Sequence, residues 1–282
     1  MSALDDLDIP ALEAWIGREE VMTDILTPAL VSRFGATFGD WVMTPDEGVA
    51  PGLHWCIAQP AVDHAGLGPD GHPKRGGFLP PVPFQNRMWA GGEVTFRAPL
   101  RAGDEVTRSS RIESLKPKEG RSGPLVFVAV RHLYSVAGET AIEERQDIVY
   151  RPATRSDTPK GAGGDGPASP ESFTGDPVTL FRYSAMTFNG HRIHYDYPYV
   201  TETEGYAGLV VHGPIQGTLL INAAARAFGT TGLTVAYRGL APLIAGQPVT
   251  LHREGARFWL EKTDGTVTFE ARATSETDKG QA

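Results

Sequence analysis

An internal repeat constrains the fold of this chain more than any other feature. Residues 94–107 and 235–250 each carry an aromatic residue followed by Arg, and then Pro, Gly and Thr in the same order. The matched pairs are Phe96 with Tyr237, Pro99 with Pro242, Gly103 with Gly246 and Thr107 with Thr250. Three pairs are 143 residues apart and the first is 141 apart, so two residues are inserted in the second segment. Internal self-similarity is typical of repeated structural units, so the repeat favours two tandem copies of one domain over coincidence.

Both copies open a run of β-strand signals. From Glu93 onward apolar and polar residues alternate, and Gly-containing turns at 103–104 and 137–139 separate the runs. The strands expected in the second copy are Leu233 to Tyr237, Val249 to Arg253, Ala256 to Lys262 and Val267 to Thr274. Asp264-Gly265 is a favourable hairpin turn. The pattern predicts an antiparallel meander in the first copy and a second run of strands, with a hairpin, in the other.

Helical signals are confined to two places. Apolar residues from Pro10 to about Phe38 fall roughly at helical spacing, although Gly17 and Pro28 interrupt them. The stronger signal follows His212-Gly213-Pro214, where Pro214 suits a first turn and Gly229 suits the end. We therefore expect an α+β fold with its main helix in the second copy.

The domain boundaries follow from composition. Residues 152–177 are rich in Pro, Gly, Ser, Thr and Asp and hold almost no large apolar side chain, which is typical of a linker. This assigns residues 1–151 to one domain and 178–282 to the other. A Gly- and Pro-rich stretch at 66–77 reads as a long irregular loop, and such loops inside a domain are often functional.

Charge and cysteine content narrow the class of protein. The 282-residue chain has a net charge of -8 and no block of Lys and Arg, which argues against binding to nucleic acid. The acidic N-terminus lacks a signal-peptide pattern, and no apolar stretch approaches the length of a membrane span. A single cysteine, Cys56, sits in an apolar run and reads as a buried structural thiol. We expect a soluble cytoplasmic protein.

The candidate site lies at 187–196 and 208–214. The first segment contains Asn189, His191 and His194, and the second places His212 and Gly213 at the start of the expected helix. Histidine titrates near working pH and suits acid–base chemistry, while free N–H groups at a helix start stabilise negative charge on a carbonyl oxygen. Gly213 lets an acyl group approach the backbone.

Structural roles remain open for the same residues. Asp196 reads mainly as a helix cap, and His191 and His212 as packed, hydrogen-bonded side chains. A metal site at His191 and His194 lacks a cysteine or carboxylate arrangement that would complete it, so none is expected.

These segments resemble the MaoC-like hydratases and dehydratases. Thr187 to Asp196 and Gly208 to Pro214 are similar to the branch containing itaconyl-CoA and mesaconyl-C4-CoA hydratases and the type 2 3-hydroxyacyl-thioester dehydratases. Leu79 to Pro83 and Arg87 to Gly92 resemble the degenerate N-terminal half of that branch. The resemblance covers most of the chain and implies a double hotdog, with an antiparallel sheet around a central helix in each unit and the catalytic motif in the second.

The resemblance also implies roles for residues. When the family motif Asp-x-Asn-Pro-x-His ends on His194, its Asp falls on Asn189, its Asn on His191 and its Pro on Arg192. His194 is then expected to transfer protons with a water held by Asn189, because an amide does not titrate. Gly213 and His212 would hold the thioester. The residues expected to contact the rest of the substrate are Arg192, Arg87, Trp89, Tyr183 and His191, with Arg182 behind them.

The expected activity is reversible hydration of a short, branched dicarboxylic enoyl-CoA to citramalyl-CoA, with R-type stereochemistry and no cofactor beyond the CoA of the substrate. A guanidinium suits the free carboxylate because it donates two parallel hydrogen bonds. Three alternatives stay open: a 3-hydroxyacyl-thioester dehydratase of fatty acid synthesis, a hotdog thioesterase, and a non-catalytic acyl-CoA binding module. By analogy with the fold, a homodimer is expected.

Overall fold

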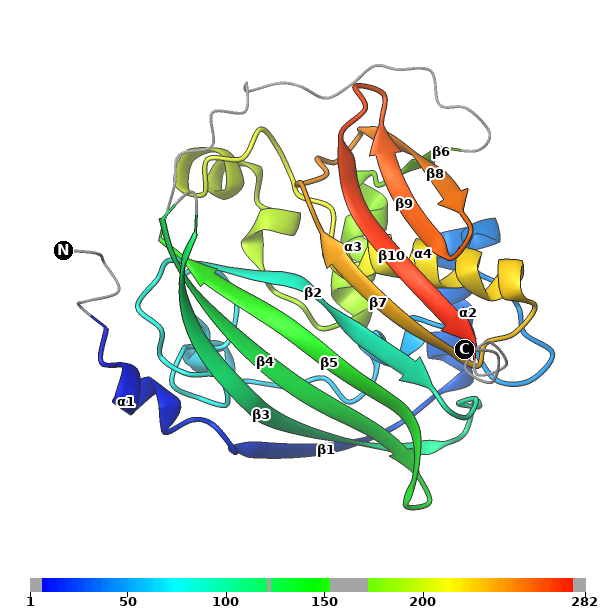
Figure 1. Ribbon diagram of the computed structural model, residues 1–282, viewed down its shortest axis with the longest axis horizontal. Coiled ribbons are helices and arrows are strands. Elements are labelled where there is room, and N and C mark those ends of the chain that lie inside the picture. Colours follow the sequence, from blue (N-terminus) through cyan, green and yellow to red (C-terminus); the bar gives the residue numbers. More distant parts are fainter. Residues whose placement is uncertain (1–6, 121–122, 153–171, 276–282) are drawn as a thin grey trace.

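The ten strands of the described chain lie in one antiparallel sheet, and each half of the sequence supplies five of them (Figure 1). The computed structural model describes residues 7–120, 123–152 and 172–275. The first half gives β1 (Glu19–Ile25), β2 (Asn86–Phe96), β3 (Glu105–Gly120), β4 (Gly123–Val136) and β5 (Glu139–Arg151). The second half gives β6 (Ser172–Thr174), β7 (Leu233–Gly239), β8 (Pro248–Glu254), β9 (Arg257–Lys262) and β10 (Val267–Ser275). Their order across the sheet is β1-β3-β4-β5-β2-β7-β10-β9-β8-β6.

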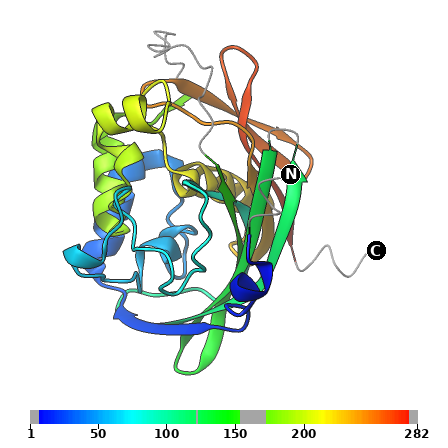
Figure 2. The same cartoon turned by 90° about the vertical axis from the view of Figure 1, so that its left-hand side faces the viewer.

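The helices pack on one side of this sheet, together with the long segment that connects α2 to β2 (Figure 2). The α-helices are α1 (Ile9–Glu13), α2 (Pro28–Phe38), α3 (Pro177–Met186) and α4 (Gly213–Phe228). Short helical turns lie at Gly39–Trp41, Leu53–Cys56, His64–Gly66, Arg192–His194 and Tyr199–Thr203. The α+β class is therefore confirmed.

The two halves repeat one order of elements. A strand and a helix, β1 and α2 or β6 and α3, precede four further strands in each half. The last three of these form a meander, β3-β4-β5 or β8-β9-β10, while the first, β2 or β7, pairs with the last strand of its half, so the expected meander is correct only for three strands. The halves join where β2 pairs with β7, and Val94 lies opposite Val235, its partner in the sequence repeat. Two equivalent residues can face each other in this way only if a pseudo-two-fold axis passes between them. The tandem duplication expected from the sequence is thus visible in the backbone.

The central helix of the second unit is α4, as predicted. Pro214 lies in its first turn, and Gly229 ends it with the left-handed backbone that glycine favours. Ten of its residues are buried, so this helix forms the centre of the hydrophobic core under β7, β9 and β10. Burial, rather than helix propensity alone, holds it in place.

Among the described residues of the first unit there is no such helix. After α2, the corresponding place is taken by the four-residue turn Leu53–Cys56. Because this turn covers less of the sheet than α4 does, side chains of β3, β4 and β5 face open space instead of a helix. The resemblance had implied a helix in each unit, and in this respect the first unit is degenerate.

Two stretches differ from the sequence-based expectation. The helical prediction for residues 10–38 is correct at α2 but wrong at Glu19–Ile25, which forms β1 along the edge of β3. Backbone pairing with β3 outweighs the helical spacing of Val21 and Ile25. Within the expected linker, residues 172–174 form β6 and pair with β8, and α3 begins at Pro177. Residues 153–171 lie outside the described residues.

The single cysteine and the lengths of the helices bear on two further expectations from the sequence. Cys56 is buried, and burial raises the pKa of its thiol, which suits a structural role rather than a nucleophile. Among the described residues, no helix has the length and apolar character required to cross a bilayer.

A buried carboxyl group ties the two units together. Glu144 of β5 is fully buried and accepts hydrogen bonds from Trp55 Nε1 at 2.8 Å and from Tyr237 Oη at 2.5 Å. Burial raises its pKa, because a charge there has no water to solvate it. Tyr237 belongs to β7, so this contact crosses the junction between β2 and β7.

Replacing Tyr237 with Phe should destabilise the protein by about 1–3 kcal/mol, because a buried acceptor loses a donor that water cannot replace. Urea denaturation measures the change. Tyr197→Phe is the matched control, since Tyr197 is exposed, and it should leave the midpoint unchanged. Equal midpoints for the two variants would contradict the role given to this contact.

Candidate active site

The turn after α3 shapes the candidate catalytic segment. Phe188 has a positive φ of 49°, a left-handed conformation that is uncommon outside glycine and that reverses the chain at the helix end. The backbone N–H of Asn189 donates to the carbonyl oxygen of Ser184 at 2.9 Å. The side-chain oxygen of Asn189 then accepts from the His191 amide at 3.0 Å, which makes an Asx-type turn. One function of Asn189 is therefore to fold the segment that carries the histidines.

His194 is held as a neutral imidazole. Its Nδ1 lies 2.7 Å from the carbonyl oxygen of Val210. Because a carbonyl only accepts, Nδ1 carries the hydrogen, and Nε2 is left with a lone pair. Burial lowers the pKa of His194 to about 3, and the contact with Val210 only partly opposes this. The ring is therefore oriented as a base.

A second imidazole holds His194 against the start of α4. The rings of His194 and His212 stack with centroids 3.5 Å apart and an interplanar angle of 15°. His212 Nε2 lies 2.9 Å from Ser184 Oγ, and His212 is the residue immediately before α4. The stack places the proposed base next to the helix N-terminus, where backbone N–H groups and the helix dipole favour negative charge. His212 thus supports His194 in addition to its expected place beside the thioester.

Gly213 is required by packing. A Cβ atom at this position would lie 2.6 Å from Cε3 of Trp89. Trp89 stacks on Tyr237 at 4.7 Å, so its ring has little freedom to move away. Close approach at Gly213 therefore brings the indole of β2 against the first turn of α4. The indole of Trp89 lines the cavity, and its Nε1 has no partner among the described residues. This placement is consistent with the expected contact between Trp89 and substrate, which remains a prediction.

The two candidate arginines differ in their surroundings. Arg192 binds Asp196 through Nε at 2.9 Å and Nη2 at 2.7 Å, donates to Pro69 O, and lies 4.0 Å above the ring of Tyr199. Its guanidinium does not line the cavity, so the expected substrate contact is not supported. Asp196 caps the Tyr199 turn as anticipated.

Arg87 lines the cavity from β2. Its positive charge reaches far enough to lower the pKa values of Asp70, His72 and His191. Arg87 is therefore the candidate arginine that lines the cavity, whereas Arg192 and Arg182 do not.

Tyr183 contributes mainly from behind the site. Its side chain is 1% exposed and packs edge-on against His212 at 5.1 Å and against Phe38 at 5.9 Å. The arrangement fixes His212 and leaves almost no surface for a substrate. Arg182, the reserve candidate, donates to Ala36 O of α2 and is absent from the cavity wall.

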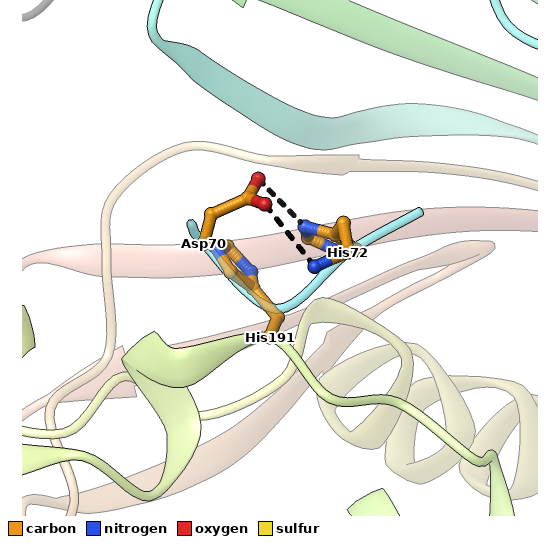
Figure 3. A group of neighbouring side chains, drawn as sticks. All are labelled: Asp70, His72 and His191. Carbon is orange, nitrogen blue, oxygen red and sulfur yellow. Dashed lines mark hydrogen bonds and ion pairs between the residues drawn. The ribbon is translucent and has the colours of Figure 1, made fainter. Parts of the chain in front are cut away.

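The structure adds two residues that the sequence interpretation did not identify. Asp70 and His72, on the irregular loop at 66–77, face His191 with their side chains directed toward one another (Figure 3). His72 Nδ1 lies 3.2 Å from Asp70 Oδ2, and the rings of His72 and His191 are 4.0 Å apart. The signal in the sequence was an Asp-x-His pair inside a loop rich in Gly and Pro, but nothing in the sequence placed it beside His191.

Asp70, His72 and His191 are side chains of the kind that bind metal ions. Donor atoms of Asp70, His72 and His191 lie within 4.8 Å of one another, so a carboxylate does stand near His191, contrary to the expectation that none would. However, one oxygen of Asp70 accepts from the His72 amide and the other from the His72 ring. We interpret the group as a hydrogen-bonded pair packed on a third ring.

The site opens into a cavity of about 1560 Å³ that both units line. His194, His212 and Gly213 form part of its wall from the second unit, and the loop with His72 forms part from the first. The cavity continues along the inner face of the first unit, where the central helix is missing. Its inner wall includes Trp55, Arg108, Val130, His132, Tyr134, Gln146 and Ile148. A volume of this size accommodates an acyl group and part of a larger carrier.

Fold and site together define a protein of two fused units in which His191, His194 and His212 gather at the N-terminus of a buried helix. Comparison with known proteins agrees. The model of the hydroxyacyl-thioester dehydratase type 2 family (Htd2) matches residues 52–245. The chain belongs to this family of MaoC-like hydro-lyases.

Individual relatives support the same assignment. A mesaconyl-C(4)-CoA hydratase of Chloroflexus aurantiacus is 40% identical over 267 residues, which cover 92% of this chain and 95% of that protein. HtdX of Mycobacterium tuberculosis superposes with a TM-score of 0.65 at 18% identity, covering 90% of this chain and 99% of that one. Another protein of that bacterium, described as a double hotdog, gives a TM-score of 0.53 at 12% identity, covering 95% and 96%. The double-hotdog expectation is confirmed.

Replacing Gly213 with Ala should reduce both stability and activity, because the new methyl group would displace Trp89 and the first turn of α4. The expected cost of overpacking is about 1–3 kcal/mol, measured by urea denaturation. Gly35→Ala is the control: no atom lies within 4 Å of its added Cβ, and alanine favours the helix there. If both variants proved equally stable, the close contact would not be a constraint.

Proposed function

We propose that this chain catalyses the reversible hydration of a short, branched dicarboxylic enoyl-CoA, with mesaconyl-C4-CoA as the leading substrate and citramalyl-CoA as the product. One observation carries the proposal: a neutral imidazole, His194, presents a free Nε2 beside the N-terminus of α4. The name of the 40% identical relative supports the same substrate class.

The geometry supports a defined division of labour. Nε2 of His194 removes a proton from water as the water oxygen attacks the β-carbon of the double bond. The thioester oxygen takes up the displaced electron pair, and the N–H groups at the start of α4 stabilise it. Asn189 lines the same cavity and is the proposed holder of the attacking water, through its side-chain amide.

Arg87 is the proposed partner of the free carboxylate. In mesaconyl-C4-CoA that carboxylate is attached to the β-carbon, the same atom that water attacks. Its binding group must therefore face the same cavity as the base, and Arg87 lines that cavity together with His194. A guanidinium can grip the carboxylate with two hydrogen bonds and so orient the double bond.

Two features of the proposal concern selectivity. Itaconyl-CoA is a second substrate of the proposed class, and R-type stereochemistry is expected at the new centre.

The principal alternative is dehydration of 3-hydroxyacyl thioesters in fatty acid synthesis. The extent of the cavity along the first unit favours it, since a longer acyl chain would fit there. Rates across acyl-CoAs of increasing length distinguish the two, and release of free thiol would instead identify a thioesterase.

The setting of the reaction is part of the proposal. Addition of water needs no redox change, and the described residues offer their own acid–base groups, so we propose catalysis without a metal or organic cofactor. A cytoplasmic homodimer is proposed as the working form. The acyl-CoA substrate itself is consistent with the family.

His194→Gln should lower kcat for hydration of mesaconyl-C4-CoA by about 10²- to 10⁴-fold, because glutamine cannot accept the proton of water. Loss of the conjugated enoyl absorbance measures the rate. His252→Gln makes the same change on β8, where the ring stacks on Trp259 outside the cavity, and should keep the wild-type rate. Near-normal hydration by His194→Gln would rule out this base.

Arg87→Ala should lower kcat/KM for mesaconyl-C4-CoA by about 10²-fold or more, since a charged hydrogen-bonding pair is lost, while crotonyl-CoA, which lacks the free carboxylate, should lose far less. Arg192→Ala serves as the comparison, because its guanidinium is bound to Asp196 and should not discriminate between the two substrates. A similar loss on both substrates with Arg87→Ala would remove it from carboxylate recognition.

A further inference from the structure

The proposed reaction leaves one proton unassigned. Hydration requires a base at the water and an acid at the α-carbon, and the position at which the family motif carries a carboxylate is Asn189 in this chain. An amide cannot supply that proton. If the chain is a hydratase as proposed, another group of the described chain must perform this transfer.

The loop of the first unit is fixed against the catalytic segment by backbone contacts. The Arg192 amide donates to Asp70 O at 2.9 Å, and Arg192 Nη1 donates to Pro69 O at 3.0 Å. Gly71, with φ of +86°, approaches Gly190 so closely that a Cβ there would lie 1.9 Å from the Gly190 carbonyl oxygen. The loop at 66–77 is therefore held in place as part of the cavity wall.

Asp70 orients the ring of His72. Its Oδ1 accepts from the His72 amide at 3.1 Å, and its Oδ2 accepts from His72 Nδ1 at 3.2 Å. Because the carboxylate accepts at Nδ1, the other ring nitrogen, Nε2, is the one left to exchange a proton. This is the arrangement by which a carboxylate fixes the tautomer of a catalytic histidine. The side chain of His72 is 22% exposed and that of Asp70 is 19% exposed, and both line the same cavity as His194.

The distances keep this pair within the site. The ring of His72 packs on His191 at 4.0 Å, and His191 meets His194 edge-on at 5.4 Å. His72 of the first unit and His194 of the second therefore line one cavity, with the ring of His191 packed against both. An acyl group in this cavity can thus meet an imidazole from each unit.

We propose that His72, oriented by Asp70, is the second catalytic residue and exchanges the proton of the substrate α-carbon. In hydration, His194 Nε2 takes a proton from water while the water oxygen bonds to the β-carbon, and the π electrons move into the enolate. Protonated His72 Nε2 then forms the new C–H bond at the α-carbon. The proton on His194 passes to solvent, His72 regains one from solvent, and one water is consumed in total.

Charges around His72 link this step to the dicarboxylic substrate. Burial lowers the pKa of His72 to about 4, and the charge of Arg87 is the next largest cause, with Arg75 adding to it and Asp70 opposing it. A substrate carboxylate bound to Arg87 would cancel part of that charge and favour the protonated ring. The acid would therefore be charged most readily when the preferred substrate is in place.

The test is hydration of mesaconyl-C4-CoA in D₂O by the full-length protein, with product stereochemistry as the readout. The wild-type enzyme should place one deuterium at the α-carbon in a single configuration. His72→Gln should lower kcat by about 10²-fold or more with little change in KM. Its residual product should carry deuterium in both configurations, because solvent then protonates the enolate from either face. A merely structural role would slow turnover without scrambling the product.

Asp70→Asn is the second variant and covers the case in which His72→Gln does not fold. It should lower kcat by about tenfold and keep a single configuration, since the ring remains present but is less well oriented. His252→Gln should match wild type in rate and configuration. Thermal unfolding of each variant verifies the fold.

Three results would overturn the proposal: wild-type kcat in His72→Gln, a single product configuration in that variant, or loss of wild-type activity on chelation with restoration by Zn²⁺. The last would make the three side chains a metal site instead. If the wild-type protein hydrates no enoyl-CoA at all, the proposed function fails first, and this failure is distinguishable from the others.

Discussion

The pairing of β2 with β7 is the interaction on which the rest of the structure depends. It merges two five-strand sheets into one, and it passes through the contact between Val94 and Val235. The same junction carries Trp89 to the start of α4 and brings Tyr237 to the buried Glu144. Without it, the loop of the first unit would not reach the histidines of the second.

Burial gives the site its chemical character. His191, His194 and His212 all have pKa values below the ordinary histidine value, and removal from water is the main cause for each. Neutral rings can pack against one another, as the stack of His194 on His212 shows, whereas charged rings would repel. Burial therefore favours the neutral form of all three rings.

Much of this could be predicted from the sequence, because the signals are local. The repeat, the strands of both meanders and the limits of α4 follow from alternation, turns, Pro214 and Gly229. The segment from Asn189 to His194 is also a local signal, because it places two histidines and an amide within six residues. What could not be predicted depends on contacts between distant residues: the strand at Glu19–Ile25, the use of Arg192 as a structural cation, and the approach of His72 to His191. None of these leaves a periodic pattern in the chain.

The fusion of the two units has a further consequence. In an assembly of identical subunits, every substitution occurs in both copies, so a two-fold axis reproduces each site twice. Here the copies share one chain, and each position on either side of Val94 and Val235 is free to differ from its counterpart. That freedom allows one unit to retain the long helix while the other holds only a short turn and a loop. An asymmetric centre, with unlike partners facing each other across a single substrate, is thus open to a fused pair but not to two identical subunits related by a two-fold axis.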